Sequence, residues 1–133
     1  MSNKKTQAEI NSHNEPIYAE IERLRAELRD VQAKYDSLED FKAKVQNHQD
    51  SFADVSTAKN GKLATISYLE TDCNLCKIYL EGMKNTFWHI ANNKFNNWLF
   101  NPFYTKIDNC LQGYRNRIDM LNYMIQQQYG HLW

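Results

Sequence analysis

The sequence lacks a net charge and a long hydrophobic run, and each absence excludes a class of function. Its 133 residues include 16 Lys and Arg against 16 Asp and Glu, so no excess charge draws the chain toward nucleic acid or an anionic membrane surface. No stretch approaches the roughly 18 uninterrupted apolar residues of a membrane-spanning helix. We therefore expect neither nucleic-acid binding nor membrane insertion.

A leader peptide and a disulfide framework are also missing. The first residues are polar, and no apolar run follows Lys4 and Lys5, so the pattern of a signal or transit peptide is absent. We predict residence in the cytoplasm, or export with a partner by a route that does not read a signal peptide. The odd count of 3 cysteines argues against a disulfide framework and favours reduced thiols.

The common signatures of catalysis are absent as well. The chain has no Gly-rich phosphate loop, no Ser-nucleophile motif and no pair of acidic residues beside a nucleophile. His89 and Cys110 would lie level across a helical hairpin that turns near residue 99, as a base and a thiol nucleophile must, but a packed polar pair is the commoner arrangement. We predict no enzymatic activity, no catalytic residue and no cofactor.

The sequence does contain a regular spacing of apolar residues in three stretches. Intervals of three and four alternate, which keeps one narrow seam of each helix facing a neighbouring helix. The first seam contains Ile17, Ile21, Leu24, Leu28, Val31, Tyr35 and Leu38. The second contains Ile66, Leu69, Cys73, Cys76, Leu80, Met83, Phe87 and Ile90. The third contains Tyr104, Ile107, Leu111, Tyr114, Ile118, Leu121 and Ile125.

Turn-forming and capping residues give the expected helix boundaries. Asn14 is a good N-cap with Pro16 in the first turn, Asn60-Gly61 favours a reversal, and the segment 96–102 favours a second reversal before a helix that starts at Pro102. The sequence predicts a disordered polar N-terminus, residues 1–13, and one helical domain, residues 14–133, with helices at about 14–56, 62–96 and 102–128. The expected fold is all-α: an elongated antiparallel helical hairpin with an additional long N-terminal coiled-coil helix, which together form a three-helix bundle.

Cys73 and Cys76 have the C-x-x-C spacing of redox and zinc motifs. In a helix over 62–96 both would lie mid-helix on the seam, where small apolar side chains pack, whereas redox cysteines sit at a helix N-terminus. With the hairpin turning near residue 99, Cys110 would lie opposite residue 88, too far from Cys76 to complete a metal site. We therefore predict packed structural cysteines and no metal site.

Two further features concern helix packing and the ends of the bundle. Gly82 and Gly113 interrupt helical patterns, and a close helix crossing would account for both. Aromatic residues gather at the predicted hairpin tip and the chain end, where they either close the bundle or form an exposed patch for a partner. These residues are Trp98, Phe100, Phe103 and Trp133.

The second half, from about Leu63 to Gln128, resembles the small helical-hairpin proteins of bacterial type VII secretion, the WXG-type proteins, and more closely the longer coiled-coil-bearing partners of LXG toxins. A long helix ends in Phe95, a tip contains Trp98, and Tyr104 and Asp108 have the spacing of the family's Y-x-x-x-D export signal. The return helix contributes Phe103, Ile107, Leu111, Tyr114, Ile118, Asp119 and Leu121. The resemblance implies a protein that pairs with a toxin's helical N-terminal domain, masks its apolar faces and helps present it for export.

We therefore predict a non-enzymatic protein-interaction module, a chaperone or targeting partner that pairs with the helical domain of a type VII secretion effector. The first helix is expected to be longer than the third, so part of its seam should be free for the client. The predicted partner-binding residues are Ile17, Ile21, Leu24, Leu28, Val31, Tyr35, Leu38, Trp98, Phe100, Tyr104 and Asp108. The alternative is a self-assembling structural coiled coil, of phage or cytoskeletal type, whose first seam pairs with its own copy.

Overall fold

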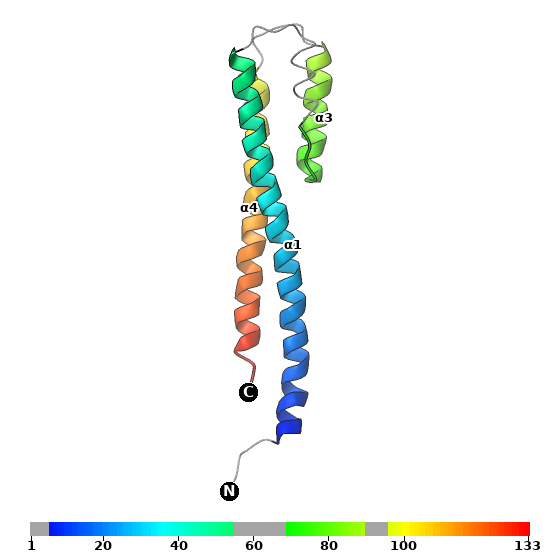
Figure 1. The fold of residues 1–133 in the computed structure, drawn as a ribbon, viewed down its shortest axis with the longest axis vertical. Coiled ribbons are helices and arrows are strands. Elements are labelled where there is room, and N and C mark those ends of the chain that lie inside the picture. Colours follow the sequence, from blue (N-terminus) through cyan, green and yellow to red (C-terminus); the bar gives the residue numbers. More distant parts are fainter. Residues whose placement is uncertain (1–5, 55–68, 90–95) are drawn as a thin grey trace. The chain divides into compact units, whose positions relative to one another are not determined.

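The computed structural model describes residues 6–54, 69–89 and 96–133, apart from the side chains of residues 48–54, 86–89 and 96–99. Three helices make up almost all of these ranges: α1 (Gln7–Asp54), α3 (Asn74–His89) and α4 (Asn96–Tyr129) (Figure 1). No strand occurs in the described ranges, so the predicted all-α three-helix fold is confirmed. None of the helices, as far as they are described, is long and apolar enough to cross a membrane.

Helix α1 begins at Gln7 rather than at Asn14. The Thr6 hydroxyl accepts a hydrogen bond from the backbone N–H of Glu9 at 3.1 Å, and the Thr6 carbonyl accepts one from the N–H of Ile10 at 3.0 Å. Thr6 is thus the N-cap, and Glu9 stands at the position where a capping box places its acidic residue. Residues 7–13, predicted to be disordered, are helical, and Pro16 lies inside the helix.

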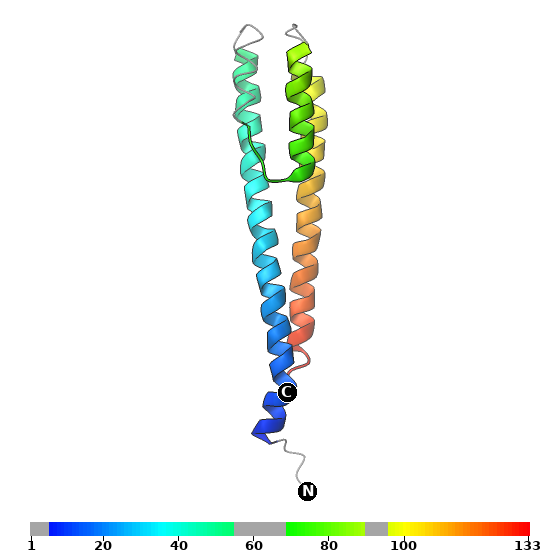
Figure 2. The same cartoon turned by 90° about the vertical axis from the view of Figure 1, so that its right-hand side faces the viewer.

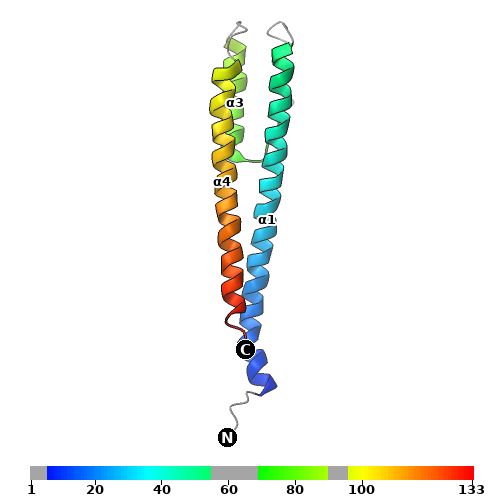
Figure 3. The same ribbon diagram turned by 90° about the vertical axis from the view of Figure 1, so that its left-hand side faces the viewer.

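The chain divides into two compact units. Unit 1 comprises Met1–Ala33 and Arg115–Trp133, and unit 2 comprises Lys34–Tyr114. In unit 1, α1 and α4 lie side by side and run in opposite directions (Figures 1 and 3). Their buried apolar residues are Ile21, Leu24, Val31, Leu121 and Ile125. Arg117 adds an ion pair with Glu27 across the two helices, with its Nε 3.0 Å from a Glu27 carboxylate oxygen.

The end of the chain is held against α1 by three contacts in unit 1. The side-chain oxygen of Asn14 accepts a hydrogen bond from the backbone N–H of Trp133 at 3.1 Å. His13 donates from Nε2 to the carbonyl of His131 at 2.8 Å, and its ring stacks on the Trp133 ring with centroids 3.6 Å apart. Asn14, which is only 7% exposed, therefore anchors the C-terminus instead of capping a helix.

Unit 2 is a three-helix core in which α3 joins the other two helices. Its buried residues are Leu38, Phe41, Val45, Leu69, Cys76, Leu80, Met83, Phe100, Phe103 and Ile107. Phe103 of α4 contacts both of the other helices. Its ring meets that of Phe41 on α1 edge-on, with the centroids 5.8 Å apart, and stacks on that of Tyr79 on α3, with the centroids 5.2 Å apart. At the surface, Lys42 pairs with Asp108 at 2.6 Å.

Within unit 2, α3 runs in the same direction as α1, and α4 runs against both (Figures 1 and 3). The α3–α4 pair is therefore the predicted antiparallel hairpin. Its turn is earlier than predicted, because α4 already begins at Asn96 and contains Pro102 in its interior. The burial of Phe100, Phe103 and Ile107 at helical spacing favours this longer helix despite the backbone hydrogen bond that Pro102 cannot make. The other predicted reversal, at Asn60-Gly61, lies outside the described residues.

Helix α3 is shorter than predicted and begins at Asn74 rather than near Lys62. Residues 69–73 are not helical, and this stretch passes from beside α1 to the start of α3 (Figure 2). Leu69 is buried in the core of unit 2, and the Thr71 hydroxyl accepts a hydrogen bond from the N–H of Cys73 at 3.2 Å. The Cys73 carbonyl accepts the first helical hydrogen bond, from Lys77 at 2.7 Å. Cys73 is therefore the N-cap of α3.

Replacing Asn14 with Ala is expected to lower the free energy of unfolding by about 1–2 kcal/mol relative to an Asn11→Ala control. Both substitutions make the same change in intrinsic helix propensity, but only Asn14 satisfies the backbone N–H of Trp133. Asn11 is exposed, and its side-chain oxygen accepts a hydrogen bond from Gln7 of its own helix. Urea denaturation followed by circular dichroism measures the difference. Equal stability of the two variants would show that the C-terminal anchor does not stabilise unit 1.

Candidate functional site: a cluster of three cysteines

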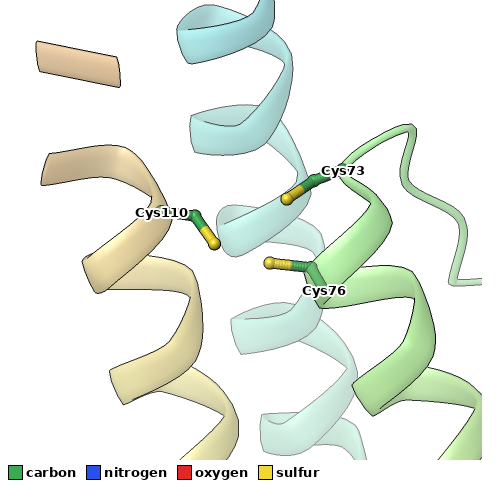
Figure 4. Close-up of side chains that lie close together, drawn as sticks. All are labelled: Cys73, Cys76 and Cys110. Atoms are coloured by element: carbon green, nitrogen blue, oxygen red, sulfur yellow. The ribbon is translucent and has the colours of Figure 1, made fainter. Parts of the chain in front are cut away.

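The three cysteines of the chain converge between α3 and α4 in unit 2. Figure 4 shows the side chains of Cys73 and Cys76, from the start of α3, pointing toward Cys110 of α4. Their sulfur atoms all lie within 4.8 Å of one another, and none of the three is in a disulfide. The prediction that Cys110 lies too far from Cys76 is wrong, because the hairpin turns before Asn96 rather than near residue 99.

The position of the C-x-x-C pair on its helix also differs from the prediction. Cys73 is the N-cap of α3 and Cys76 is the third residue of the helix, whereas a mid-helix position was expected. An N-cap side chain accepts a hydrogen bond from the backbone N–H at this third position, and here the Cys73 sulfur interacts with the backbone of Cys76. The pair thus occupies the end of a helix where a negative charge is stabilised.

The three cysteines differ in burial. Cys76 is fully buried in the core of unit 2, while Cys73 and Cys110 are partly exposed. The half-buried Tyr114, one turn beyond Cys110 on α4, also packs against this core, and its hydroxyl hydrogen-bonds with the Cys73 sulfur. The predicted packing role is therefore confirmed for Cys76, whereas Cys73 and Cys110 are only partly buried.

The surroundings shift the pKa values of the three thiols in different directions. Burial opposes ionisation of Cys73, but hydrogen bonds from the Cys76 backbone, the two neighbouring thiols and Tyr114 outweigh it and lower the pKa of Cys73. Burial raises the pKa of Cys76 and that of Cys110, and a charge on Cys73 raises both further. Burial and the same charge raise the pKa of Tyr114 to about 12, so its hydroxyl keeps its proton and can donate it to sulfur.

This arrangement supports two kinds of thiol chemistry. An ionised Cys73 beside two thiols is a nucleophile, and three converging sulfur atoms are ligands for a soft metal ion. Within the described ranges no His, Asp or Glu joins the cluster. The predicted alignment of His89 with Cys110 stays a prediction, because the side chain of His89 is not among those that the structure describes.

The predicted partner-binding residues of α1 are covered by this chain to different degrees. Ile21, Leu24 and Val31 are buried in unit 1, and Leu38 is buried in unit 2. The partly exposed members are Ile17, Leu28 and Tyr35. A client that binds this seam would have to displace the packing within the chain or use its partly exposed edge.

The predicted contacts on α4 also lie in several environments. Phe100 is fully buried, and so is Phe103, which agrees with the bundle-closing role for these two rings. Tyr104 is partly buried beside Phe100, and Asp108 is exposed and paired with Lys42. The side chain of Trp98 is not among those that the structure describes. Trp133 stacks on His13 but is still 54% exposed.

An apolar surface stripe on α3 was missed by the sequence analysis. Leu75 and Ile78 are 59% and 70% exposed and are three residues apart, so they lie on one face of the helix. Gly82 continues this face at the next turn, and in the described part of the chain no atom lies within 4 Å of an added Cβ there. The same holds at Gly113, so the predicted close crossing at the two glycines is wrong. The spacing of Leu75, Ile78 and Gly82 is visible in the sequence, but their exposure is not.

Comparisons of the chain with protein-family models, with curated proteins and with solved structures gave no match.

Cys73 is expected to react with iodoacetamide several-fold faster at neutral pH than Cys110, because the thiolate is the reactive form, the pKa of Cys73 is lowered while that of Cys110 is raised, and both residues are partly exposed. Timed alkylation of the reduced protein, with each site read by fragmentation mass spectrometry, measures the order. In urea the three thiols should react at similar rates. Faster labelling of Cys110 or Cys76 in the folded protein would contradict the assigned acidities.

Proposed function

We propose that this protein is a non-enzymatic interaction module that pairs with a helical client, as the chaperone or targeting partner of a type VII secretion effector. The observation that carries the proposal is the exposure of Leu75 and Ile78, 59% and 70%, on the outer face of α3. Burying such a side chain contributes about 1.5–3 kcal/mol. Two of them side by side supply a substantial part of a specific interface.

The glycine in the same stripe suits a helix as the binding partner. A glycine inside an exposed helix costs about 1 kcal/mol relative to Ala, and no atom of the described residues lies within 4 Å of the position that a Cβ of Gly82 would occupy. The distance between packed helices depends on the side chains at their contact, so Gly82 would let a client helix approach closely. The inward face of α3 is occupied by Cys76, Leu80 and Met83, which leaves the stripe as a separate face.

The more specific assignment to secretion depends on the resemblance in the second half of the chain. The α3–α4 pair has the antiparallel hairpin topology that is expected of that family. On α4 in unit 2, Tyr104 is partly exposed and Asp108 is exposed. In the proposed mechanism, the stripe covers an apolar face of the client helix and keeps it soluble. The Tyr104–Asp108 segment would then form part of a composite surface that the secretion machine recognises.

Substituting Ile78 with Asp is expected to weaken client binding at least tenfold, which corresponds to about 1.4 kcal/mol. The probe is the helical N-terminal domain of a toxin encoded beside this protein, and the measurement is isothermal titration calorimetry. Met120→Asp is the matched control, since it changes a side chain that is 53% exposed in unit 1, and it should bind within about twofold of the unsubstituted chain.

Light scattering of the purified chain separates the proposal from the alternative of self-assembly. A monomer that forms a defined complex with the toxin domain supports the client role. A discrete homo-oligomer of the chain alone supports a self-assembling coiled coil instead. Equal toxin binding by Ile78→Asp and Met120→Asp would contradict the role of the stripe.

Gly82→Ala is expected to raise the stability of the free chain and to lower its affinity for the client helix. The new methyl group lies within 4 Å of no atom of the described residues, so the free chain should become more stable by about 1 kcal/mol. Affinity for the helical client should fall, because the methyl group would occupy the closest point of approach. Gly113→Ala on α4 should give the same gain in thermal denaturation without a change in affinity. Loss of affinity in both variants, or in neither, would contradict a close helix contact at Gly82.

A further inference from the structure

We propose that Cys73, Cys76 and Cys110 form a three-thiolate site for one thiophilic cation, Zn²⁺ or Cu⁺, which joins the start of α3 to α4 in unit 2. The site goes beyond the client-binding function, because it uses the inner side of α3 rather than the exposed stripe. Soft sulfur ligands select these two ions among the common cellular cations.

The distances between the sulfur atoms suit a single ion. Zinc–sulfur bonds are about 2.3 Å long, which places two tetrahedral sulfur ligands roughly 3.8 Å apart. The three sulfur atoms already lie within 4.8 Å of one another, so side-chain rotations that shift the sulfur atoms by less than about 1 Å would bring all three within bonding distance of one ion. No movement of α3 or α4 is needed.

The ligands come from two elements that the fold holds independently. A C-x-x-C pair at a turn is a standard chelating unit for zinc, and here the turn is the start of α3, fixed by the burial of Leu69 and the hydrogen bond from the Cys73 N–H to Thr71. Cys110 is positioned by α4, whose neighbouring residue Ile107 is fully buried. The packing of unit 2 places Cys110 of α4 at the same height as the start of α3, and the Cys110 sulfur therefore lies beside those of Cys73 and Cys76.

The electrostatic surroundings are compatible with ionised sulfur. Three thiolates around Zn²⁺ carry a net charge of −1, and around Cu⁺ a net charge of −2. The N-terminal end of α3 favours negative charge, and the ammonium group of Lys106 acts on Cys110 from one turn away on α4. The Tyr114 hydroxyl hydrogen-bonds with the Cys73 sulfur, as outer-shell donors do in metal sites.

The binding step changes no oxidation state. Three metal–sulfur bonds form, and each thiol that is protonated beforehand releases its proton to solvent. Within the described residues no fourth His, Cys, Asp or Glu ligand is present at the cluster. Zinc would therefore take a water molecule as its fourth ligand, whereas Cu⁺ would be complete with three sulfur atoms.

The test uses the full-length chain, reduced and free of oxygen, loaded separately with Zn²⁺ alone and with Cu⁺ alone. After desalting, we expect one equivalent of metal per chain by elemental analysis, and three sulfur neighbours at about 2.3 Å by X-ray absorption spectroscopy. Cobalt substitution should produce a thiolate-to-metal charge-transfer band. Binding should also raise the melting temperature, because the metal binds the folded state preferentially.

Matched variants connect the metal to the cluster. Cys110→Ser should lower metal affinity at least tenfold, whereas Asn109→Ser, the same kind of change at an exposed neighbour on α4, should leave it unchanged. Cys110→His keeps a metal-binding side chain and should restore binding with two sulfur neighbours and one nitrogen neighbour. This rescue keeps the test valid if Cys110→Ser disturbs packing, and circular dichroism checks the fold of each variant.

Competition with chelators distinguishes the two ions. Copper retained against a Cu⁺-specific chelator, together with displacement of zinc by copper, assigns the site to Cu⁺. Zinc retained against a zinc chelator, with copper lost to its own chelator, assigns it to Zn²⁺. The proposal is overturned if the reduced chain retains no more of either metal than Cys110→Ser, or if the bound metal has fewer than three sulfur neighbours.

Discussion

The packing of Phe103 fixes the arrangement on which the rest of unit 2 depends. Its ring is fully buried, meets Phe41 of α1 edge-on and stacks on Tyr79 of α3. Aromatic pairs in these geometries are favourable beyond the area that they bury, and loss of a buried Phe typically costs about 3–5 kcal/mol. Because Phe103 sets which turn of α3 is level with which turn of α4, it also determines that Cys110 meets Cys73 and Cys76.

The start of α3 is the second constraint, and it gives the C-x-x-C pair its chemical character. The non-helical stretch from Leu69 to Cys73 places Leu69 in the core, and the helix begins only after it. Two cysteines that would be inert packing residues in mid-helix thereby become the N-cap and the third residue of a helix. One face of α3 then carries sulfur toward α4, while the stripe of Leu75, Ile78 and Gly82 is exposed.

The apolar spacing predicted the helical class and most of the buried residues, including Leu24, Leu80 and Ile107. The helix boundaries were less predictable, because Pro16 and Pro102 were assigned to first turns and both lie inside helices. A proline inside a helix costs about 3 kcal/mol, and buried apolar residues on both sides of Pro102 offset that cost. The displaced boundary of α4 moved the hairpin turn, which is why the sulfur cluster was excluded from sequence alone.

The sequence by itself determined which side of each helix is apolar, since a helical period fixes the angle of every residue around the axis. It did not determine the position of one helix along another, because a seam of similar apolar residues can pair at several levels. That choice is made by non-local packing, here of Phe103, Tyr79 and Phe41. The convergence of three cysteines and the exposure of Leu75 and Ile78 both follow from it, and so only the tertiary structure decided them.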